Sequence, residues 1–171
     1  MHTFTRIVAS LALLSAAACG GKETAQSAPP RSDLPEKFHL AQAPAGAVDV
    51  AAAHASAKDG ETVAVRGAVG GSTHPFVEGV AAFTIVDPAL ESCENDGMNC
   101  PTPWDYCCVD PSSLAKGTAM IEISEGGQLV KANPRGFHGL DHLVTVVVQG
   151  TAKRDARGNL SIVATGIHPQ P

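Results

Sequence analysis

The stretch "ETVAVRGAVGG" (residues 61–71) has the two-residue period of a β-strand. Its alternation places Val63, Val65 and Val69 on one face, as in a strand that is buried on one side. Gly67 stands on that same face, where a further valine would continue the pattern. An isolated glycine inside a strand indicates a bulge or a tight bend of the kind found in small barrels. The stretch therefore predicts a curved first strand in a β domain.

Four further stretches with strand-like patterns follow the first one. In "TAMIEISE" (118–125), for example, Ala119, Ile121 and Ile123 share one face. "DARGN" (155–159) is typical of a hairpin turn. The expected strands are "VAAFTIVD" (80–87), "TAMIEISE" (118–125), "HLVTVVVQGTAKR" (142–154) and "LSIVATGIHP" (160–169), with a short return strand in "QLV" (128–130).

Helical structure is expected only in short segments. The alanine-rich stretch "VDVAAAHASA" (48–57) predicts a short helix, with Asp49 placed to cap its start. "DPSSLAKG" (110–117) predicts one helical turn. "KANPRGFHGLDH" (131–142) contains one proline and two glycines, which indicates a loop. The chain is therefore expected to be mainly β.

The order and spacing of these strands resemble the oligonucleotide/oligosaccharide-binding (OB) fold. The resemblance rests on "VAVRGAVGG", "AAFTIVD" and "VTVVVQGTA…LSIVATGI", and it covers residues 61–168. It implies a five-stranded, partly open Greek-key barrel. The alternative architecture is a small β-sandwich. Residues 47–171, about 125 in number, fit one domain of ordinary size.

The N-terminus has the pattern of an export signal. Arg6 precedes the apolar run "IVASLALLSAAA", which is shorter than the roughly 20 residues that span a bilayer. Cys19 follows directly, and this junction resembles the lipobox of bacterial lipoproteins. The resemblance implies removal of residues 1–18, lipids on Cys19 and attachment to the cell envelope. With Gly20 next in the chain, it implies the outer membrane, facing the periplasm.

Residues 19–46 are expected to form a disordered tether between the lipid and the domain. Prolines and small polar residues dominate this segment. Such a composition buries too little apolar surface to offset the entropy lost on ordering. Its apolar pair, Phe38 and Leu40, is accordingly expected to stay in solvent.

Four cysteines lie between the second and third expected strands, in a loop of about 30 residues (88–117). An even number of thiols in an exported domain favours disulfides. We therefore expect two disulfides among Cys93, Cys100, Cys107 and Cys108. The pairing is open between a nested set, Cys93–Cys108 with Cys100–Cys107, and the crossed one. A bond between the adjacent Cys107 and Cys108 makes a strained ring.

An alternative role for this loop is metal or haem handling. Thiolates and imidazoles bind copper or zinc, and the candidate ligands are Cys107, Cys108, His138 and His142. The spacing C-x6-C-x6-C-C lacks the short cysteine pair of structural zinc sites. The primary expectation is therefore a protein without a cofactor.

The stretch "CPTPWDYCC" (100–108) also holds the only tryptophan and the only tyrosine of the chain. Aromatic residues make up 4% of the sequence, so their concentration in one loop indicates a purpose. We consider two interpretations for Trp104, Asp105 and Tyr106. They plug the open end of the barrel with buried apolar area, or they form the rim of a site for a flat ligand.

The whole chain resembles bacterial envelope lipoproteins that carry one OB-like barrel and a cysteine-bearing "PWDYCC" loop, a resemblance that implies no activity. The formal net charge is −5 and the basic residues are scattered, whereas phosphate binding needs clustered Lys and Arg. No nucleophile elbow or phosphate loop is present in the sequence. We therefore expect a non-enzymatic, lipid-anchored binding or scaffolding module for a small ligand or an envelope protein, and no binding to nucleic acid.

Overall fold

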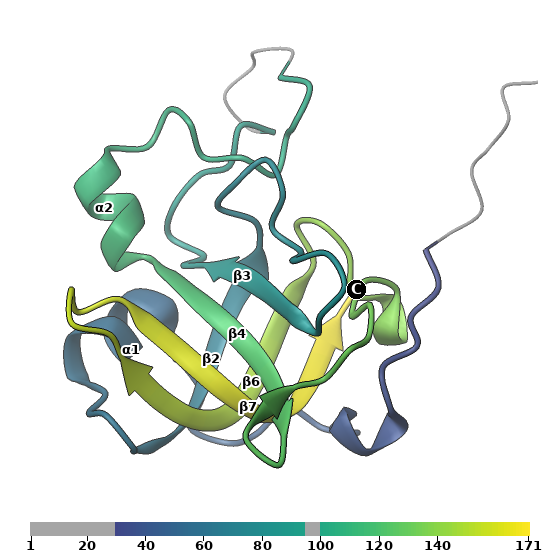
Figure 1. Ribbon diagram of the computed structural model, residues 1–171. Helices are drawn as coiled ribbons and strands as arrows, with labels where there is room; N and C mark the ends of the chain where they lie inside the picture. Colours follow the sequence, from purple (N-terminus) through teal and green to yellow (C-terminus); the bar gives the residue numbers. More distant parts are fainter. Residues whose placement is uncertain (1–29, 95–99) are drawn as a thin grey trace, which may run out of the picture.

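A computed structural model describes residues 30–94 and 100–171 (Figure 1). Its main feature is a closed sheet in which the strands follow the order β2-β3-β4-β7-β6 and return to β2. All neighbours are antiparallel except β4 and β7, which run parallel. The strands are β2 (Thr62–Val69), β3 (Ala82–Val86), β4 (Thr118–Glu125), β6 (Thr145–Arg154) and β7 (Leu160–Gln170). The predicted five-stranded OB-like barrel is thereby confirmed, and the sandwich alternative is wrong.

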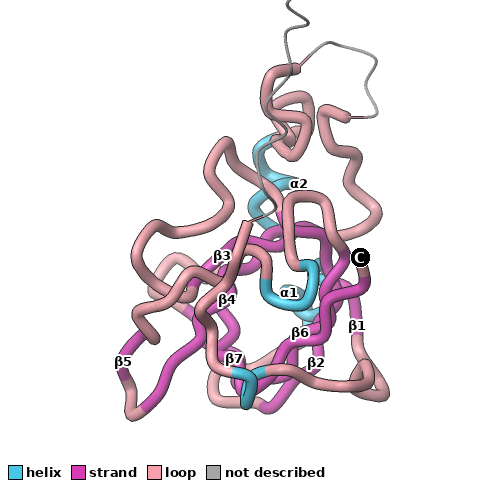
Figure 2. The backbone as a smooth tube through the Cα atoms, turned by 90° about the vertical axis from the view of Figure 1, so that its right-hand side faces the viewer, coloured by secondary structure: helices cyan, strands magenta, loops and turns pink. Residues whose placement is uncertain are grey.

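The remaining elements are short. β1 (Val48–Asp49) pairs in parallel with β2, and β5 (Gln128–Leu129) pairs in antiparallel fashion with the end of β4. α1 (Val50–Ser56) lies across the opening of the ring of strands (Figure 2), and it contributes buried residues to the barrel core. The other helical segments are η1 (Glu36–Phe38), α2 (Pro111–Lys116) and η2 (Phe137–Gly139). The helices expected within 48–57 and 110–117 are both present.

Gly67 lies where β3 and α1 pack closely against β2. A Cβ atom at this position would lie 2.8 Å from the carbonyl oxygen of Val86 and 2.9 Å from Cγ2 of Val50. The glycine therefore provides room for β3 and α1 inside the barrel. A register shift lies elsewhere, between Gln149 and Gly150 of β6.

The start of α1 is capped by a different residue from the one that the sequence indicated. The Asp49 side chain makes no capping hydrogen bond and instead binds Arg66, with 2.8 Å between Oδ1 and Nε. The N–H of Ala51 donates to Oδ2 of Asp87 over 2.7 Å. Asp87 is only 4% exposed and also accepts from the N–H of Ala89. The prediction that Asp49 caps α1 is wrong, because a buried carboxylate from the end of β3 occupies that role.

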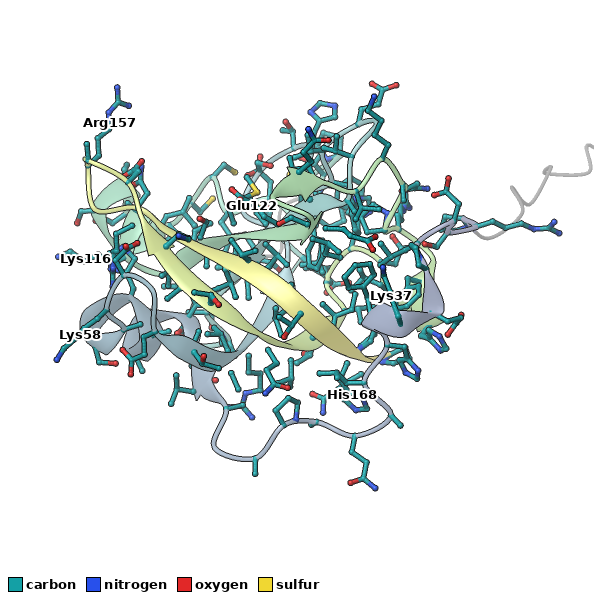
Figure 3. All side chains as sticks on the ribbon, turned by 60° about the horizontal axis from the view of Figure 1, so that its bottom comes forward. Lys37, Lys58, Lys116, Glu122, Arg157 and His168 are labelled. Atoms are coloured by element: carbon teal, nitrogen blue, oxygen red, sulfur yellow. The ribbon has the colours of Figure 1, made fainter. Side chains whose placement is uncertain are left out.

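The segment before the barrel is docked on it from residue 32 onwards. Phe38 is 6% exposed and belongs to the core, and the side chain of Leu40 fills the space above Gly166 in β7. The N–H of Leu40 donates to the carbonyl of Ile167 over 2.9 Å. The carbonyl of Leu40 lies 2.7 Å from Nδ1 of His168. Figure 3 shows His168 on the same side of the molecule as Lys37. The expectation that Phe38 and Leu40 remain in solvent is wrong.

The predicted signal peptide (1–18), the lipidated Cys19 and residues 20–29 of the predicted tether lie outside the described residues. Within the described part of the chain, no helix is long and apolar enough to cross a membrane.

Candidate functional site

The cysteine loop folds back on itself at one end of the barrel. Its two arms are joined by backbone hydrogen bonds from Cys93 N–H to Asp105 carbonyl, 2.9 Å, and from Glu94 N–H to Pro103 carbonyl, 3.0 Å. The loop then enters α2, where the Asp110 carboxylate caps the helix. The expected helical turn therefore anchors the C-terminal end of the loop, directly before β4 (Figure 1).

Three of the four thiols meet inside this loop. The sulfur atoms of Cys93, Cys100 and Cys107 all lie within 4.8 Å of one another, and Cys93 and Cys107 are 3.1 Å apart. Cys108 lies beside them, with its sulfur 3.9 Å from that of Cys107. Disulfide formation remains a prediction, and the short gap between Cys93 and Cys107 favours the crossed pairing, Cys93–Cys107 with Cys100–Cys108.

The environments of these thiols differ strongly. Cys93 is 2% exposed, and burial raises its pKa to about 11. Hydrogen bonding with the backbone and side chain of Thr102 lowers the pKa of Cys100. Cys100 is therefore the thiol that ionises more readily, and its thiolate forms within reach of the buried Cys93 sulfur.

The structure separates the roles of the three residues predicted at the rim. Tyr106 is 3% exposed, and its ring packs so closely on Gly70 that a Cβ there would lie 2.9 Å from Cε2. Asp105 accepts a hydrogen bond from the N–H of Tyr106. Tyr106 is therefore buried against the end of β2, while Trp104 is half-buried and lines a surface groove.

Trp104 is held in a fixed orientation by contacts with two other loops. Its ring stacks on His142 with a centroid distance of 3.8 Å and an interplanar angle of 7°. Its Nε1–H donates to the carbonyl of Thr73 over 3.1 Å, and its carbonyl accepts from the N–H of Gly71. Phe76 lies behind the stack, 5.5 Å from the His142 ring. The indole is therefore ordered before any ligand arrives.

The groove beside this stack has a volume of about 400 Å³. Among the residues that the structure describes, no carboxylate lines it, although the chain has a net charge of −5. The guanidinium of Arg135 is positioned by Asp141, with 2.7 Å between Nε and Oδ1. The lining residues are Thr73, His74, Pro75, Phe76, Thr102, Trp104, Arg135 and His142. Sequence spacing missed Phe76 and Arg135, because the groove joins three loops that are distant in the sequence.

The four ligands proposed for a shared metal site are not brought together. Among the described residues, the groups of three that could hold an ion are Cys93–Cys100–Cys107 and Glu36–His39–His138. Neither group combines a thiol with an imidazole. His138 stacks on His39, whereas His142 stacks on Trp104. A site made of Cys107, Cys108, His138 and His142 is therefore not formed.

We predict that protonation of His142 lowers the emission of Trp104. Burial and then Arg135 lower the pKa of His142 from 6.5, while Asp141 opposes the shift. The folded state therefore favours the neutral imidazole. The stability that this group contributes is present above pH 6.5 and is lost as the pH falls through the folded-state pKa. A fluorescence titration from about pH 8 to about pH 5 should show a transition with its midpoint below 6.5.

His74→Gln is the matched control for this titration, because His74 lines the same groove without stacking on the indole. It should leave the transition in place, whereas His142→Gln should remove it. A midpoint at or above 6.5 would contradict the effect of burial on His142.

Comparison with known proteins assigns this chain to no family. No protein-family model matches the chain, and no curated protein matches it.

Proposed function

We propose that this protein is a non-enzymatic, lipid-anchored envelope protein whose OB-like barrel binds a small ligand in the groove beside Trp104. The ligand has a flat apolar part and an anionic group. The observation that carries the proposal is the fixed Trp104–His142 stack in a groove that, within residues 30–94 and 100–171, is lined by a guanidinium and by no carboxylate. The apolar run before Cys19 supports the anchor, and the cysteine loop contributes Thr102 and Trp104 to the groove wall.

The apolar part of the ligand is inferred from the groove wall. Trp104, Phe76 and Pro75 offer ring surfaces, and the indole is fixed by its hydrogen bond to Thr73. Aromatic faces favour flat partners, and a prearranged wall avoids the entropy of ordering side chains on binding. Ligand sites are usually of this kind, mainly apolar with few polar groups.

The anionic part is inferred from charge. A guanidinium has five N–H donors, and Asp141 engages Arg135 through Nε. His74 and His142 add imidazoles to the same groove, and none of its described lining residues is acidic. A carboxylate is the anion that guanidinium geometry suits in a small organic ligand. An aromatic carboxylate therefore combines both requirements.

Benzoate is the probe that tests the proposal, with benzyl alcohol as its uncharged counterpart. We expect benzoate to change Trp104 emission in a saturable way and at least about tenfold more tightly than benzyl alcohol. Arg135→Gln should bring the two probes to similar affinity. Lys153→Gln removes an exposed cation of β6 outside the groove lining and should leave the preference intact.

Equal binding of both probes by the wild type would contradict an anion site. An unchanged preference in Arg135→Gln would contradict the role of the guanidinium. Absence of any saturable response to benzoate, in emission and in calorimetry, would overturn the groove as the binding site.

A metal-handling function is the second candidate, and it is favoured by the convergence of Cys93, Cys100 and Cys107. Three thiolates suit soft ions such as Cu(I), and also Zn²⁺. The two candidates require opposite thiol states, because a stapled binding module keeps its cysteines paired. The thiol state is therefore the measurement that separates them.

A further inference from the structure

A second group of metal-binding side chains lies outside the groove, where the N-terminal segment meets the loop before β6. It consists of Glu36, His39 and His138, whose ligand atoms all lie within 4.8 Å of one another. Oε2 of Glu36 is 2.8 Å from Nε2 of His138. The rings of His39 and His138 stack with centroids 3.6 Å apart and an angle of 5°. Two imidazoles and one carboxylate thus converge from segments about 100 residues apart in the chain.

Packing beneath the three side chains holds both segments in place. Phe137 is 3% exposed, and its ring packs edge-on against the rings of His39 and His138. The distances between ring centroids are 6.1 and 4.7 Å, respectively. His39 forms a parallel bridge with Ile167 of β7, and the neighbouring Phe38 is buried. The ligands therefore rest on the barrel core, although Glu36 and His138 reach solvent.

The N-terminal segment is also tied to the opposite loop by hydrogen bonds. The Ser32 hydroxyl donates to the carbonyl of Asn133 over 2.6 Å, and the N–H of Asn133 donates to Asp33 over the same distance. These bonds hold the two backbones side by side. Binding of an ion would therefore order side chains but little backbone, which reduces the conformational entropy lost on binding.

His138 has a left-handed backbone conformation, which is uncommon for residues other than glycine. Its φ is 45° and its ψ is 39°, between Gly136 at φ 95° and Gly139 at φ 84°. Glycine, or asparagine among side-chain residues, takes this left-handed region at lower cost. The turn therefore accepts histidine and would also accept asparagine.

We propose that Glu36, His39 and His138 form a binding site for a divalent transition-metal ion, and Zn²⁺ is the ion that we would use to test it. Zn²⁺ binds imidazole nitrogen and carboxylate oxygen at about 2.0–2.2 Å, which places tetrahedral ligand atoms about 3.3 Å apart. The two imidazole rings now lie parallel, so one ring has to turn out of the stack before both nitrogen lone pairs point to the same ion. The ion would take the place of the hydrogen bond between Glu36 and His138, and its remaining position would be open to water or to another donor.

Such an ion would fasten the N-terminal segment to the barrel. Glu36 and His39 belong to the segment, and His138 belongs to the loop, so the ion joins the two. Anything that binds only the docked state stabilises that state by mass action. Zn²⁺ should therefore raise the thermal unfolding midpoint of the protein. This site is distinct from the Trp104 groove and from the thiols.

The test is calorimetric titration with Zn²⁺ on protein purified from cells that express the full chain, after alkylation of accessible thiols. We expect one equivalent to bind, and His138→Asn to weaken the affinity at least about tenfold. Asparagine suits the left-handed turn, so this variant keeps the fold while it removes the imidazole. His39→Gln should have the same effect, and His54→Gln, which lies on α1, should bind like the wild type.

Loss of the equivalent in both His138→Asn and His39→Gln, with Trp104 emission unchanged, would support the site. Wild-type affinity in His138→Asn would overturn it. Binding that is present before alkylation and absent after it would also overturn it, because the thiols would then be the ligands. A Zn²⁺-induced rise in the unfolding midpoint should be absent from both site variants, and a rise that persists in them would contradict the proposal.

Discussion

Replacing Gly67 by valine is expected to lower the free energy of unfolding by about 3 kcal/mol, the upper range for an overpacked core. The substitution restores the two-residue valine pattern of β2, and it is destabilising for a geometric reason. The first carbon of the side chain would already lie 2.8 Å from the Val86 carbonyl, 2.9 Å from Val50 Cγ2 and 3.1 Å from Ile85 Cβ. The nearest of these atoms belongs to the backbone of β3 and can move only if the barrel opens. Urea unfolding followed by Trp104 emission measures the effect.

Ala64→Val is the matched control, because it also introduces valine into β2. Ala64 is half-buried, whereas Gly67 is buried. We expect a change of less than about 1 kcal/mol there, since valine suits a half-buried strand surface. If Gly67→Val were as stable as Ala64→Val, the close approach of β3 to β2 would be wrong.

Cys93→Ser is expected to cost about 3 kcal/mol of unfolding free energy in oxidised protein, the value for closing a loop of about 15 residues. The reason is the predicted Cys93–Cys107 bond, between sulfur atoms that lie 3.1 Å apart. The denatured wild-type mass should fall about 4 Da below the all-thiol mass, because two disulfides release four hydrogens. Peptide mapping should identify Cys93–Cys107 and Cys100–Cys108.

A double-mutant cycle separates the bond from the packing of Cys93. If the two residues are bonded, Cys107→Ser should cost as much as Cys93→Ser, and the double variant should cost no more than either one. Additive losses would contradict this pairing. Free thiols with a retained metal ion would overturn the disulfides and favour the metal-handling candidate.

The barrel could be predicted from the sequence because period-two patterns report burial directly. In β4, Ala119, Ile121 and Ile123 alternate with more exposed residues as expected. The cap of α1 could not be predicted in this way. Asp49 has the right position in the sequence, but Asp87 reaches the helix through the fold, 36 residues further along the chain.

The candidate sites also combine residues that a local sequence pattern indicated with residues that only the fold brings together. The concentration of aromatic residues around Trp104 could be recognised in the sequence. Its stacking partner His142 could not, because the two residues come together only where three loops meet at one end of the barrel. The docking of Phe38 could not be recognised either. The side chain of Leu40, two residues further on, fills space above β7 that Gly166 provides more than 100 residues later, and composition does not report such a gap.

The connectivity of the barrel also determines the order in which the protein acquires its structure. β3 and β4 flank the cysteine loop and pair with each other, whereas closure requires β2 to find β6, as in the pairing of Thr62 with Thr151. Pairings between distant parts of a chain form slowly because long loops must close first. We therefore expect the thiols to meet while the sheet is still open, when an oxidant reaches Cys93. In the folded protein Cys93 is 2% exposed, so its own sulfur is shielded, whereas Cys107 and Cys108 stay exposed.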